Sequence, residues 1–187
     1  MGETRITNAQ DCGSKLEALK QRAKAVLPAG TIRVYDLMPV FEDAVLFAEI
    51  TRALAEPFAG RVDVVVAPEA LGWVLGAALA RELGVGFVGV RKKGKLPYPP
   101  DRLVSQHFAD YDGPKTLQLR SDAPLPGKRV LLTDEWIETG SQAQALLRLL
   151  GHWDCQVVGI AALGIDRNSV TTPWLDTGFA HCLGTDW

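Results

Sequence analysis

The feature that most constrains the fold is a repeated order of short apolar runs and longer amphipathic segments. Residues 62–67 (VDVVVA) and 129–133 (RVLLT) are short and mostly apolar, and proline or charged residues follow them closely. Runs of this kind are typical of strands that are buried on both faces of a parallel sheet. The sequence predicts further strands at residues 86–90, 116–120 and 157–162.

Segments with helical periodicity separate these strands. One follows the first apolar run at about residues 72–83 and ends at Gly84, and another follows the RVLLT run at about residues 141–150. Nearer the N-terminus, apolar side chains repeat on one face of two helices that begin close to Ser14 and Glu42. Strands that alternate with helices indicate an α/β fold with a doubly wound, mostly parallel sheet flanked by helices.

Composition argues against several classes of protein. The 187 residues carry a net charge of −2, so no basic surface for nucleic acid is expected. No run reaches the roughly 18 apolar residues of a membrane-spanning helix, and the polar N-terminus lacks the apolar core of a signal peptide. The three cysteines are widely spaced, which predicts no disulfide framework and favours a cytoplasmic location.

Charged side chains gather after two of the predicted strands. The basic group consists of Arg91, Lys92, Lys93 and Lys95, and the acidic group consists of Asp134, Glu135 and Glu138. In open parallel sheets, ligands bind outside the carboxyl ends of the strands. We therefore expect both groups at the same edge of the sheet.

The segment from Asp134 to Gln142 carries the most chemical information. Two adjacent carboxylates end a strand, and a Thr-Gly-Ser turn opens the next helix. The free N–H groups of a helix N-terminus bind anions such as phosphate, while adjacent carboxylates accept hydrogen bonds from sugar hydroxyls or help to hold a divalent cation. This combination predicts a site for a phosphorylated ribose. The alternative is an ordinary strand–loop–helix connection in which Thr139 caps the helix.

The same segment, DEWIETGSQ, resembles the phosphoribosyl-pyrophosphate (PRPP) motif of type I phosphoribosyltransferases. Residues 62–100 are similar to the adenine phosphoribosyltransferase branch of this family, above all in RKKGKLP, and Val34-Tyr35-Asp36-Leu37 resembles an early segment of that branch. The similarity covers roughly residues 31–165. It implies the type I phosphoribosyltransferase fold, with an N-terminal arm and small hood in residues 1–40 and the core in residues 41–187.

The resemblance also implies an activity. A ribose 5-phosphate group would pass between PRPP and a purine-like or other heterocyclic base, with Mg²⁺ as the cofactor and pyrophosphate as the released product. The implied partners are PRPP or a nucleotide, a base, and a second copy of the chain in a homodimer.

Residue roles follow at the matching positions. The ribose 5-phosphate side would comprise Asp134, Glu135, Glu138, Thr139, Gly140, Ser141 and Gln142. The pyrophosphate side would comprise Glu69, Ala70, Leu71, Gly72, Arg91 and Lys95, and the base side Val34 and Tyr35. The implied catalytic carboxylates are Asp134, Glu135 and Glu138, of which the first two would hold the metal through ribose or water. Residues 95–111 would form a flexible lid, ending at Asp110-Tyr111.

Five positions depart from the family pattern, namely Tyr35, Leu71, Glu138, Ser141 and Gln142. Arginines are usual at the positions of Leu71 and Tyr35, and a guanidinium is hard to replace in phosphate binding. A non-catalytic relative that binds PRPP or a nucleotide is therefore an alternative, as is an enzyme that takes a nucleotide as donor. Glu138 is either a carboxylate that faces the base or an exposed loop acid. Trp136 either stacks on a ring or, as we favour, belongs to the core.

Overall fold

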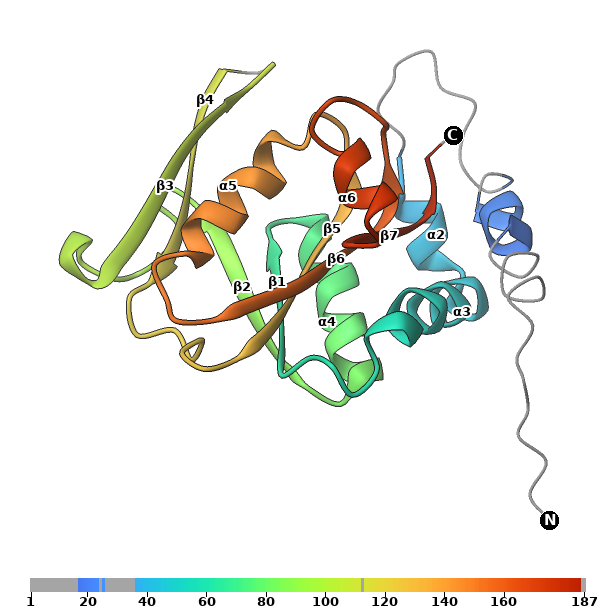
Figure 1. The fold of residues 1–187 in the computed structure, drawn as a ribbon, viewed down its shortest axis with the longest axis horizontal. Helices are drawn as coiled ribbons and strands as arrows, with labels where there is room; N and C mark the ends of the chain where they lie inside the picture. The colour runs from blue at the N-terminus through green and yellow to red at the C-terminus, as the bar shows by residue number, and fades with distance from the viewer. Residues whose placement is uncertain (1–16, 24, 26–35, 112, 186–187) are drawn as a thin grey trace.

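The computed structural model describes residues 17–23, 25, 36–111 and 113–185. In this part of the chain, a seven-stranded sheet runs through the centre in the order β3-β4-β2-β1-β5-β6-β7 (Figure 1). The strands are β1 (Val64–Pro68), β2 (Gly86–Lys92), β3 (Leu103–Asp110), β4 (Gly113–Arg120), β5 (Arg129–Ile137), β6 (Gln156–Ile165) and β7 (Ala180–Gly184).

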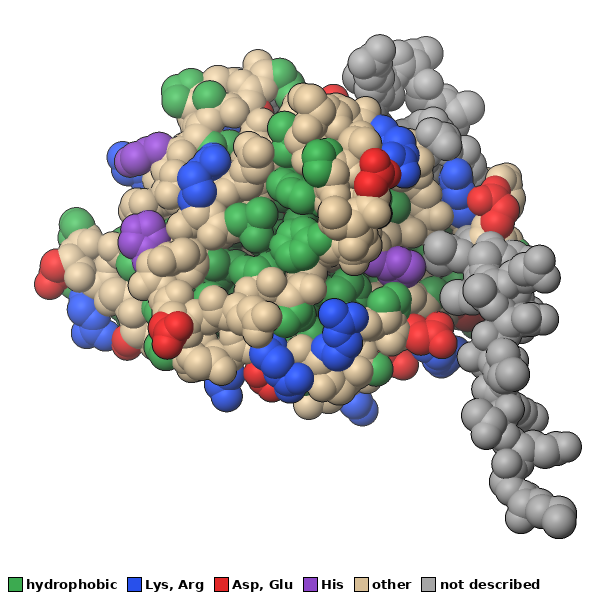
Figure 2. All heavy atoms as spheres, in the orientation of Figure 1, with side chains coloured by type: hydrophobic (Ala, Val, Ile, Leu, Met, Phe, Trp, Pro, Cys, Tyr) green, Lys and Arg blue, Asp and Glu red, His purple; other side chains and the backbone are tan. Residues whose placement is uncertain are grey.

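Helices cover both faces of this sheet. The helices are α2 (Met38–Glu42), α3 (Ala44–Ala55), α4 (Leu71–Leu83), α5 (Ser141–Leu150) and α6 (Thr172–Asp176), with 3-10 turns η1 (Glu56–Phe58) and η2 (Pro100–Arg102). Residues 17–23 and 25 are also helical. On the face of the molecule shown in Figure 2, apolar side chains gather at the centre and charged ones of both signs are scattered around them.

Alternate residues of the central strands face two separate apolar cores. On β1, Val64 and Val66 pack with the apolar face of α5, whereas Val65 between them packs with α2, α3 and α4. All three side chains are at most 5% exposed. The predicted burial of this strand on both faces is therefore confirmed, and it follows from the two-residue repeat of a strand covered by helices on both sides.

The pairing confirms the predicted doubly wound, mostly parallel sheet. Strand β1 pairs in parallel with β2 and with β5, and β5, β6 and β7 continue the parallel ladder. The exception is the hairpin of β3 and β4, whose two strands pair antiparallel and whose β4 joins β2 antiparallel. The carboxyl ends of β1, β2 and β5 consequently lie side by side.

Several boundaries differ from those predicted. Strand β5 does not end at Thr133 but continues to Ile137, so the acid pair belongs to the strand. The second half of the expected lid at residues 95–111 is the regular strand β3, which pairs with β4 along its whole length and whose side chains alternate between half-buried and exposed. Helix α6 and strand β7 were not predicted. The expected boundary between residues 40 and 41 lies inside α2.

The packing of α5 allows a stability test. Leu146 is fully buried among the strands, so Leu146→Ala leaves a cavity and should lower the free energy of unfolding by about 2–5 kcal/mol. Val45 on α3 is 63% exposed, and Val45→Ala should change it by no more than about 0.5 kcal/mol. Urea unfolding measures both, and an equal effect of the two substitutions would contradict this packing.

Candidate functional site

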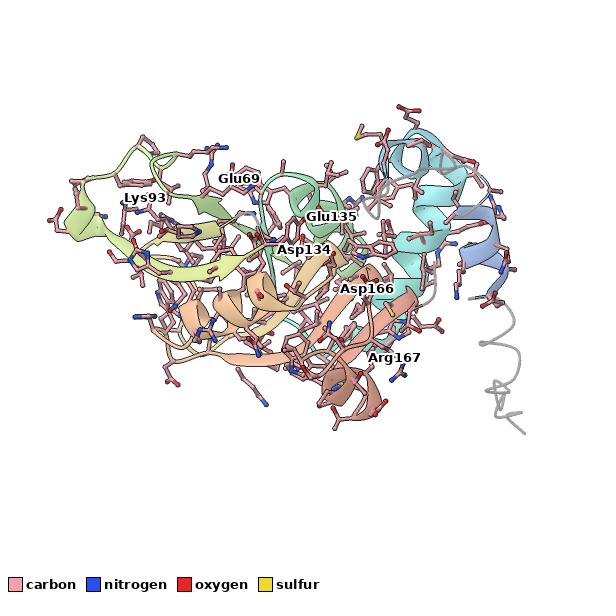
Figure 3. All side chains as sticks on the ribbon, turned by 90° about the horizontal axis from the view of Figure 1, so that it is seen from above. Glu69, Lys93, Asp134, Glu135, Asp166 and Arg167 are labelled. Carbon is pink, nitrogen blue, oxygen red and sulfur yellow. The ribbon has the colours of Figure 1, made fainter. Side chains whose placement is uncertain are left out.

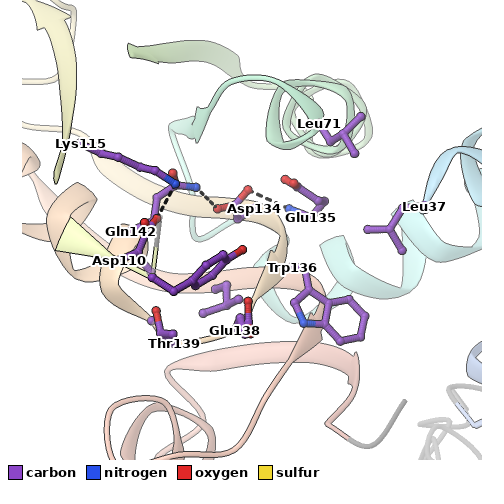
Figure 4. Close-up of a pocket in the computed structure, with 14 residues that line it drawn as sticks. Leu37, Leu71, Asp110, Lys115, Asp134, Glu135, Trp136, Glu138, Thr139 and Gln142 are labelled. Atoms are coloured by element: carbon purple, nitrogen blue, oxygen red, sulfur yellow. Dashed lines mark hydrogen bonds and ion pairs between the residues drawn. The ribbon is translucent and has the colours of Figure 1, made fainter. Parts of the chain in front are cut away.

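A pocket of about 260 Å³ lies where β5 ends and α5 begins (Figure 4). Strand β5, the turn after it and the first turn of α5 line most of it, as Asp134, Glu135, Trp136, Ile137, Glu138, Thr139, Gly140, Gln142 and Ala143. The remaining lining residues are Leu37, Leu71, Asp110, Tyr111 and Lys115. Residues that are far apart in the sequence thus meet at the strand ends, as expected for this sheet.

The carboxyl group of Asp134 is built into the wall of the pocket and is only 3% exposed. Its Oδ2 accepts a hydrogen bond of 2.8 Å from the Gln142 side chain, and its Oδ1 accepts one of 3.0 Å from the Glu135 N–H. Gly72 at the start of α4 lies against the same carboxyl, because a Cβ there would come within 2.8 Å of Oδ1. Asp134 therefore connects the starts of two helices.

Burial raises the pKa of Asp134 well above its ordinary value, and the neighbouring Glu135 raises this pKa further by hydrogen bonding and like charge. The hydrogen bond from Gln142 opposes the shift. Figure 4 shows the two acids next to each other. Glu135 is half-buried and lines the pocket, so it is the member of the pair that is better placed to meet a ligand.

The turn before α5 presents backbone groups to the pocket. Gly140 has φ +81°, in the left-handed region that glycine adopts without strain. This glycine precedes the helix as its N-cap, without a side-chain cap among the described residues. Thr139 Oγ1 instead accepts the Ser141 N–H at 3.2 Å and donates to Ser141 Oγ at 2.9 Å. Thr139 thus takes up the N–H of the first residue of α5, although Gly140 stands at the N-cap position. The N-terminus of the helix faces the pocket through Gly140 and Gln142, and such a terminus favours an anion.

The residues expected on the pyrophosphate side lie in two separate places. Leu71 lines the pocket, whereas Glu69, Arg91 and Lys95 form a separate ion cluster at the ends of β1 and β2. Glu69 Oε2 lies 3.1 Å from Arg91 Nε, and its Oε1 lies 3.4 Å from Lys95 Nζ. Figure 3 shows Glu69 on the Lys93 side of Asp134. Among the described residues, the basic group is thus partly neutralised by an acid of its own.

Glu69 is firmly held in this cluster. Its side chain is 8% exposed, and Oε1 also accepts the Lys92 N–H at 2.7 Å. Burial favours a raised pKa, but the hydrogen bonds from Lys92 and Arg91 and the charges of Arg91 and Lys95 outweigh it and hold the pKa of Glu69 below its ordinary value. The Arg91 guanidinium also lies 5.2 Å from the Trp73 ring. Ala70 and Ser141 do not line the pocket.

The tip of the β3–β4 hairpin completes the pocket. Asp110 and Tyr111, expected at the end of the lid, both line it. Lys115 Nζ lies 2.7 Å from Asp110 Oδ2 and 5.9 Å from the Tyr111 ring. Sequence reasoning missed Lys115, which is the only basic residue among the described residues that line the pocket. No signal in the sequence pointed to it: Lys115 precedes the strand predicted at residues 116–120, and its contact with Asp110 arises from the β3–β4 pairing, in which Lys115 lies opposite Phe108.

Apolar side chains line the other side of the pocket. Trp136 packs against the core between the sheet and α3, as favoured, and its ring lies on Gly164, where a Cβ would come within 2.4 Å of it. The same residue also lines the pocket together with Leu37. Val34 and Tyr35, expected on the base side, lie outside the described residues.

Comparison with known proteins agrees with this geometry. A family model described as a phosphoribosyl transferase domain matches residues 42–180, which include both strand ends and the turn before α5. The chain belongs to the phosphoribosyltransferase family. It is therefore of the type I fold that the PRPP motif predicted, and its curated relatives are those of the adenine branch.

Individual relatives of this phosphoribosyltransferase support the same assignment. A protein of Methylobacterium sp. (strain 4-46) named adenine phosphoribosyltransferase is 40% identical over 76% of this chain and 79% of its own length. A crystal structure of adenine phosphoribosyltransferase from Thermoanaerobacter pseudethanolicus has a TM-score of 0.78 and 32% identity, over 89% of this chain and 99% of its own. The yeast enzyme, complexed with an imino-altritol bisphosphate and adenine, has a TM-score of 0.74 and 25% identity, over 89% of this chain and 98% of its own.

The described residues contain neither a membrane-spanning helix nor a cluster of metal ligands. No helix in residues 17–23, 25, 36–111 and 113–185 has the length and apolar character needed to cross a membrane. Within the same ranges, no group of three or more His, Cys, Asp or Glu side chains is arranged to hold a metal ion.

The buried carboxyl of this phosphoribosyltransferase predicts a pH dependence of stability. Because the pKa of Asp134 is raised in the folded protein, the folded state binds more protons than the unfolded state as soon as the pH exceeds the ordinary value of 3.8. Stability is thus lost as the pH rises from there through the raised pKa. Asp134→Asn removes this loss, so its stability relative to the wild type should increase between pH 4.5 and pH 7.5.

Urea unfolding of both proteins at the two pH values measures this change. Asp122→Asn serves as the control because its carboxyl is half exposed and pairs with arginines at the surface. A relative stability of Asp134→Asn that stays constant or falls with pH would contradict the burial of a carboxyl that resists ionisation.

Proposed function

We propose that this protein transfers the 5-phosphoribosyl group of PRPP to a purine-like base and releases pyrophosphate. The observation that carries the proposal is a single pocket in which the end of β5 and the N-terminus of α5 supply a carboxylate pair and a glycine turn. The family membership supports the reaction class, and the names of the relatives make adenine the first base to test.

In this proposal the ribose 5-phosphate group occupies the β5–α5 end of the pocket. Its phosphate would accept hydrogen bonds from backbone N–H groups of the 138–142 segment, at the positive end of the α5 dipole. Glu135 would accept hydrogen bonds from the ribose hydroxyls, and the buried Asp134 would hold Glu135 and Gln142 in place. Carboxylates beside the anomeric carbon also stabilise the positive charge that develops when the bond to pyrophosphate breaks.

The donor set fits Mg²⁺ only in company with the substrate. Mg²⁺ commonly binds one or two carboxylates together with substrate phosphates and water. The pocket offers Glu135 and the less accessible Asp134, and the described residues form no metal cluster by themselves. Bound Mg²⁺ would neutralise negative charge on the departing pyrophosphate. Arg91 and Lys95 are the proposed contacts of the protein with pyrophosphate. To make these contacts, the two side chains would break their ion pairs with Glu69.

The base would lie toward the apolar wall formed by Leu37 and Trp136. Glu138 lines the same pocket, and its carboxylate is proposed to accept a proton or a hydrogen bond from the incoming base. Val34 and Tyr35 are retained as proposed base-side residues on the resemblance alone.

We also propose a homodimer in the cytoplasm. The family resemblance supports the dimer, and the free thiols of Cys155 and Cys182 suit a reducing compartment. Sedimentation velocity of the purified protein tests the oligomeric state.

A non-catalytic relative that binds PRPP or a nucleotide is the second candidate. Two observations favour it. Leu71 lines the pocket at the position where the family resemblance implies arginine. Glu69 forms ion pairs with both Arg91 and Lys95, the two proposed contacts with pyrophosphate. Incubation with Mg-PRPP and a panel of purine and pyrimidine bases, followed by chromatography of nucleotide products, distinguishes the two. Product with at least one base supports the transferase; binding of AMP without any product supports the alternative.

Glu135 provides the sharpest test of the ribose assignment. Glu135→Gln removes a charged acceptor, so kcat/KM for PRPP should fall by about 10- to 100-fold, the equivalent of about 1–3 kcal/mol. Glu82→Gln is the matched control because Glu82 is an exposed residue near the far end of α4, and it should retain wild-type kinetics. Unchanged kinetics of Glu135→Gln would remove the ribose assignment.

Leu71 tests the pyrophosphate side. Leu71→Arg would place a guanidinium at the mouth of the pocket, where it can bind phosphate oxygens in a bidentate manner. The KM for PRPP should therefore fall, and inhibition by pyrophosphate should strengthen, by about tenfold, the equivalent of one charged hydrogen bond. Leu71→Met retains the apolar side chain and should change neither constant. A higher KM for the arginine variant would show that position 71 does not face pyrophosphate.

A further inference from the structure

The turn that lines the pocket is supported from behind by the segment that follows β6. Asn168 is the centre of this support. Its Nδ2 donates a hydrogen bond of 2.8 Å to the backbone oxygen of Glu138, across 30 residues of sequence. Asn168 itself does not line the pocket, whereas Glu138 and Thr139 do. The asparagine therefore holds the turn on the side away from the pocket.

The support segment is itself rigidly built. Asn168 Oδ1 accepts the N–H groups of Val170 at 2.8 Å and Thr171 at 3.1 Å. Thr171 is fully buried, and its hydroxyl accepts the Asn168 N–H at 3.1 Å while it donates to the backbone oxygen of Asp166. Figure 3 shows Asp166 next to the candidate site. One side chain thus closes its own turn and reaches the pocket turn at the same time.

Side-chain packing adds to this hydrogen bond. A Cβ added to Gly140 would come within 2.7 Å of Val170 Cγ1 and 3.3 Å of Thr171 Cγ2. The support segment therefore lies directly against the glycine of the pocket turn. The position of Gly140 thus depends on the apolar atoms of Val170 and Thr171, and the direction of the Glu138 carbonyl depends on the Asn168 side chain.

The direction of one carbonyl determines the direction of the next N–H. The only cis peptide among the described residues is Glu69–Ala70, so the peptide between Glu138 and Thr139 is trans and planar. In such a peptide the C=O and N–H point in opposite directions. Since the Glu138 oxygen faces Asn168 behind the turn, the Thr139 N–H points away from Asn168.

We propose that Asn168 is a positioning residue for phosphate binding. It fixes the 138–139 peptide, so that the Thr139 N–H faces the site where the 5-phosphate of PRPP binds. This inference rests on the proposed function, because it takes the 138–142 turn as the phosphate-binding element. It assigns to Asn168 no contact with the substrate.

Two substitutions separate the two roles of the side chain. Asn168→Asp retains an oxygen that can accept the Val170 and Thr171 N–H groups, but it loses the amide donor to Glu138 and its longer bond of 3.3 Å to the Asp166 backbone oxygen. Asn168→Ala loses both. Thr171→Val is the matched control: it retains the methyl group against Gly140, and it loses a hydroxyl that bonds only within the support segment.

The test measures the Kd for Mg-PRPP by calorimetry, KM and kcat at saturating base, and the melting temperature of each full-length variant. Asn168→Ala and Asn168→Asp should each raise the Kd and KM for PRPP by about tenfold, because one positioned hydrogen bond is lost. The kcat should stay within about threefold of the wild type, since a phosphate contact acts equally in ground and transition states. Thr171→Val should lower the melting temperature and leave the Kd within about twofold.

Three outcomes overturn the inference. They are an unchanged Kd in both Asn168 variants, an equal rise of Kd in Thr171→Val, or a fall in kcat with unchanged Kd. If the wild-type protein binds neither Mg-PRPP nor ribose 5-phosphate, the proposed function fails as well. Binding by the wild type together with unchanged Asn168 variants overturns the positioning role alone.

Discussion

The acid pair of the candidate site depends on the pairing of β5 with β6, which extends beyond the residues of β5 that pair with β1. This ladder continues past Thr133, so that Asp134 lies opposite Ala162 and Trp136 opposite Gly164. Along this stretch Asp134 is buried between the starts of α4 and α5, Glu135 is half-buried at the pocket, and Trp136 lies on Gly164.

The charge balance of the pocket follows from this arrangement. Apart from Asp134, whose pKa is raised by burial, its described lining contains three acids, Asp110, Glu135 and Glu138, and one lysine, Lys115, which is paired with Asp110. The cations at the end of β2 do not offset this charge freely, because Arg91 and Lys95 form ion pairs with Glu69. A polyphosphate therefore meets an acidic pocket unless a divalent cation enters with it. The same balance suits a ligand whose sugar and base present hydrogen-bond donors to carboxylates.

The sequence was sufficient for the elements that bury a continuous apolar run. The sequence predicted strands β1, β2, β5 and β6 and helices α4 and α5. In each of them, the spacing of apolar residues and the turn residues at the ends indicate the same element. Strand β3 was hidden, since the prolines that precede it suggested a loop and only its pairing with β4 makes it regular. The acid pair and glycine turn were predicted as a site from their residue types. Lys115 and Asn168 could not be, because their importance comes from contacts with Asp110 and Glu138 made by the fold.

Two polar side chains hold the turn before α5 in place. From one side, the buried Asp134 binds the Gln142 side chain at the start of α5; from the other, Asn168 binds the Glu138 backbone. Both hydrogen bonds are partly buried, so water competes with them less than with fully exposed ones. The two bonds span the turn near its ends, at residues 138 and 142, and leave the backbone between them to face the pocket. A phosphate-binding turn needs such fixed ends. If its N–H groups had to be ordered when the anion binds, the entropy lost in ordering them would weaken binding.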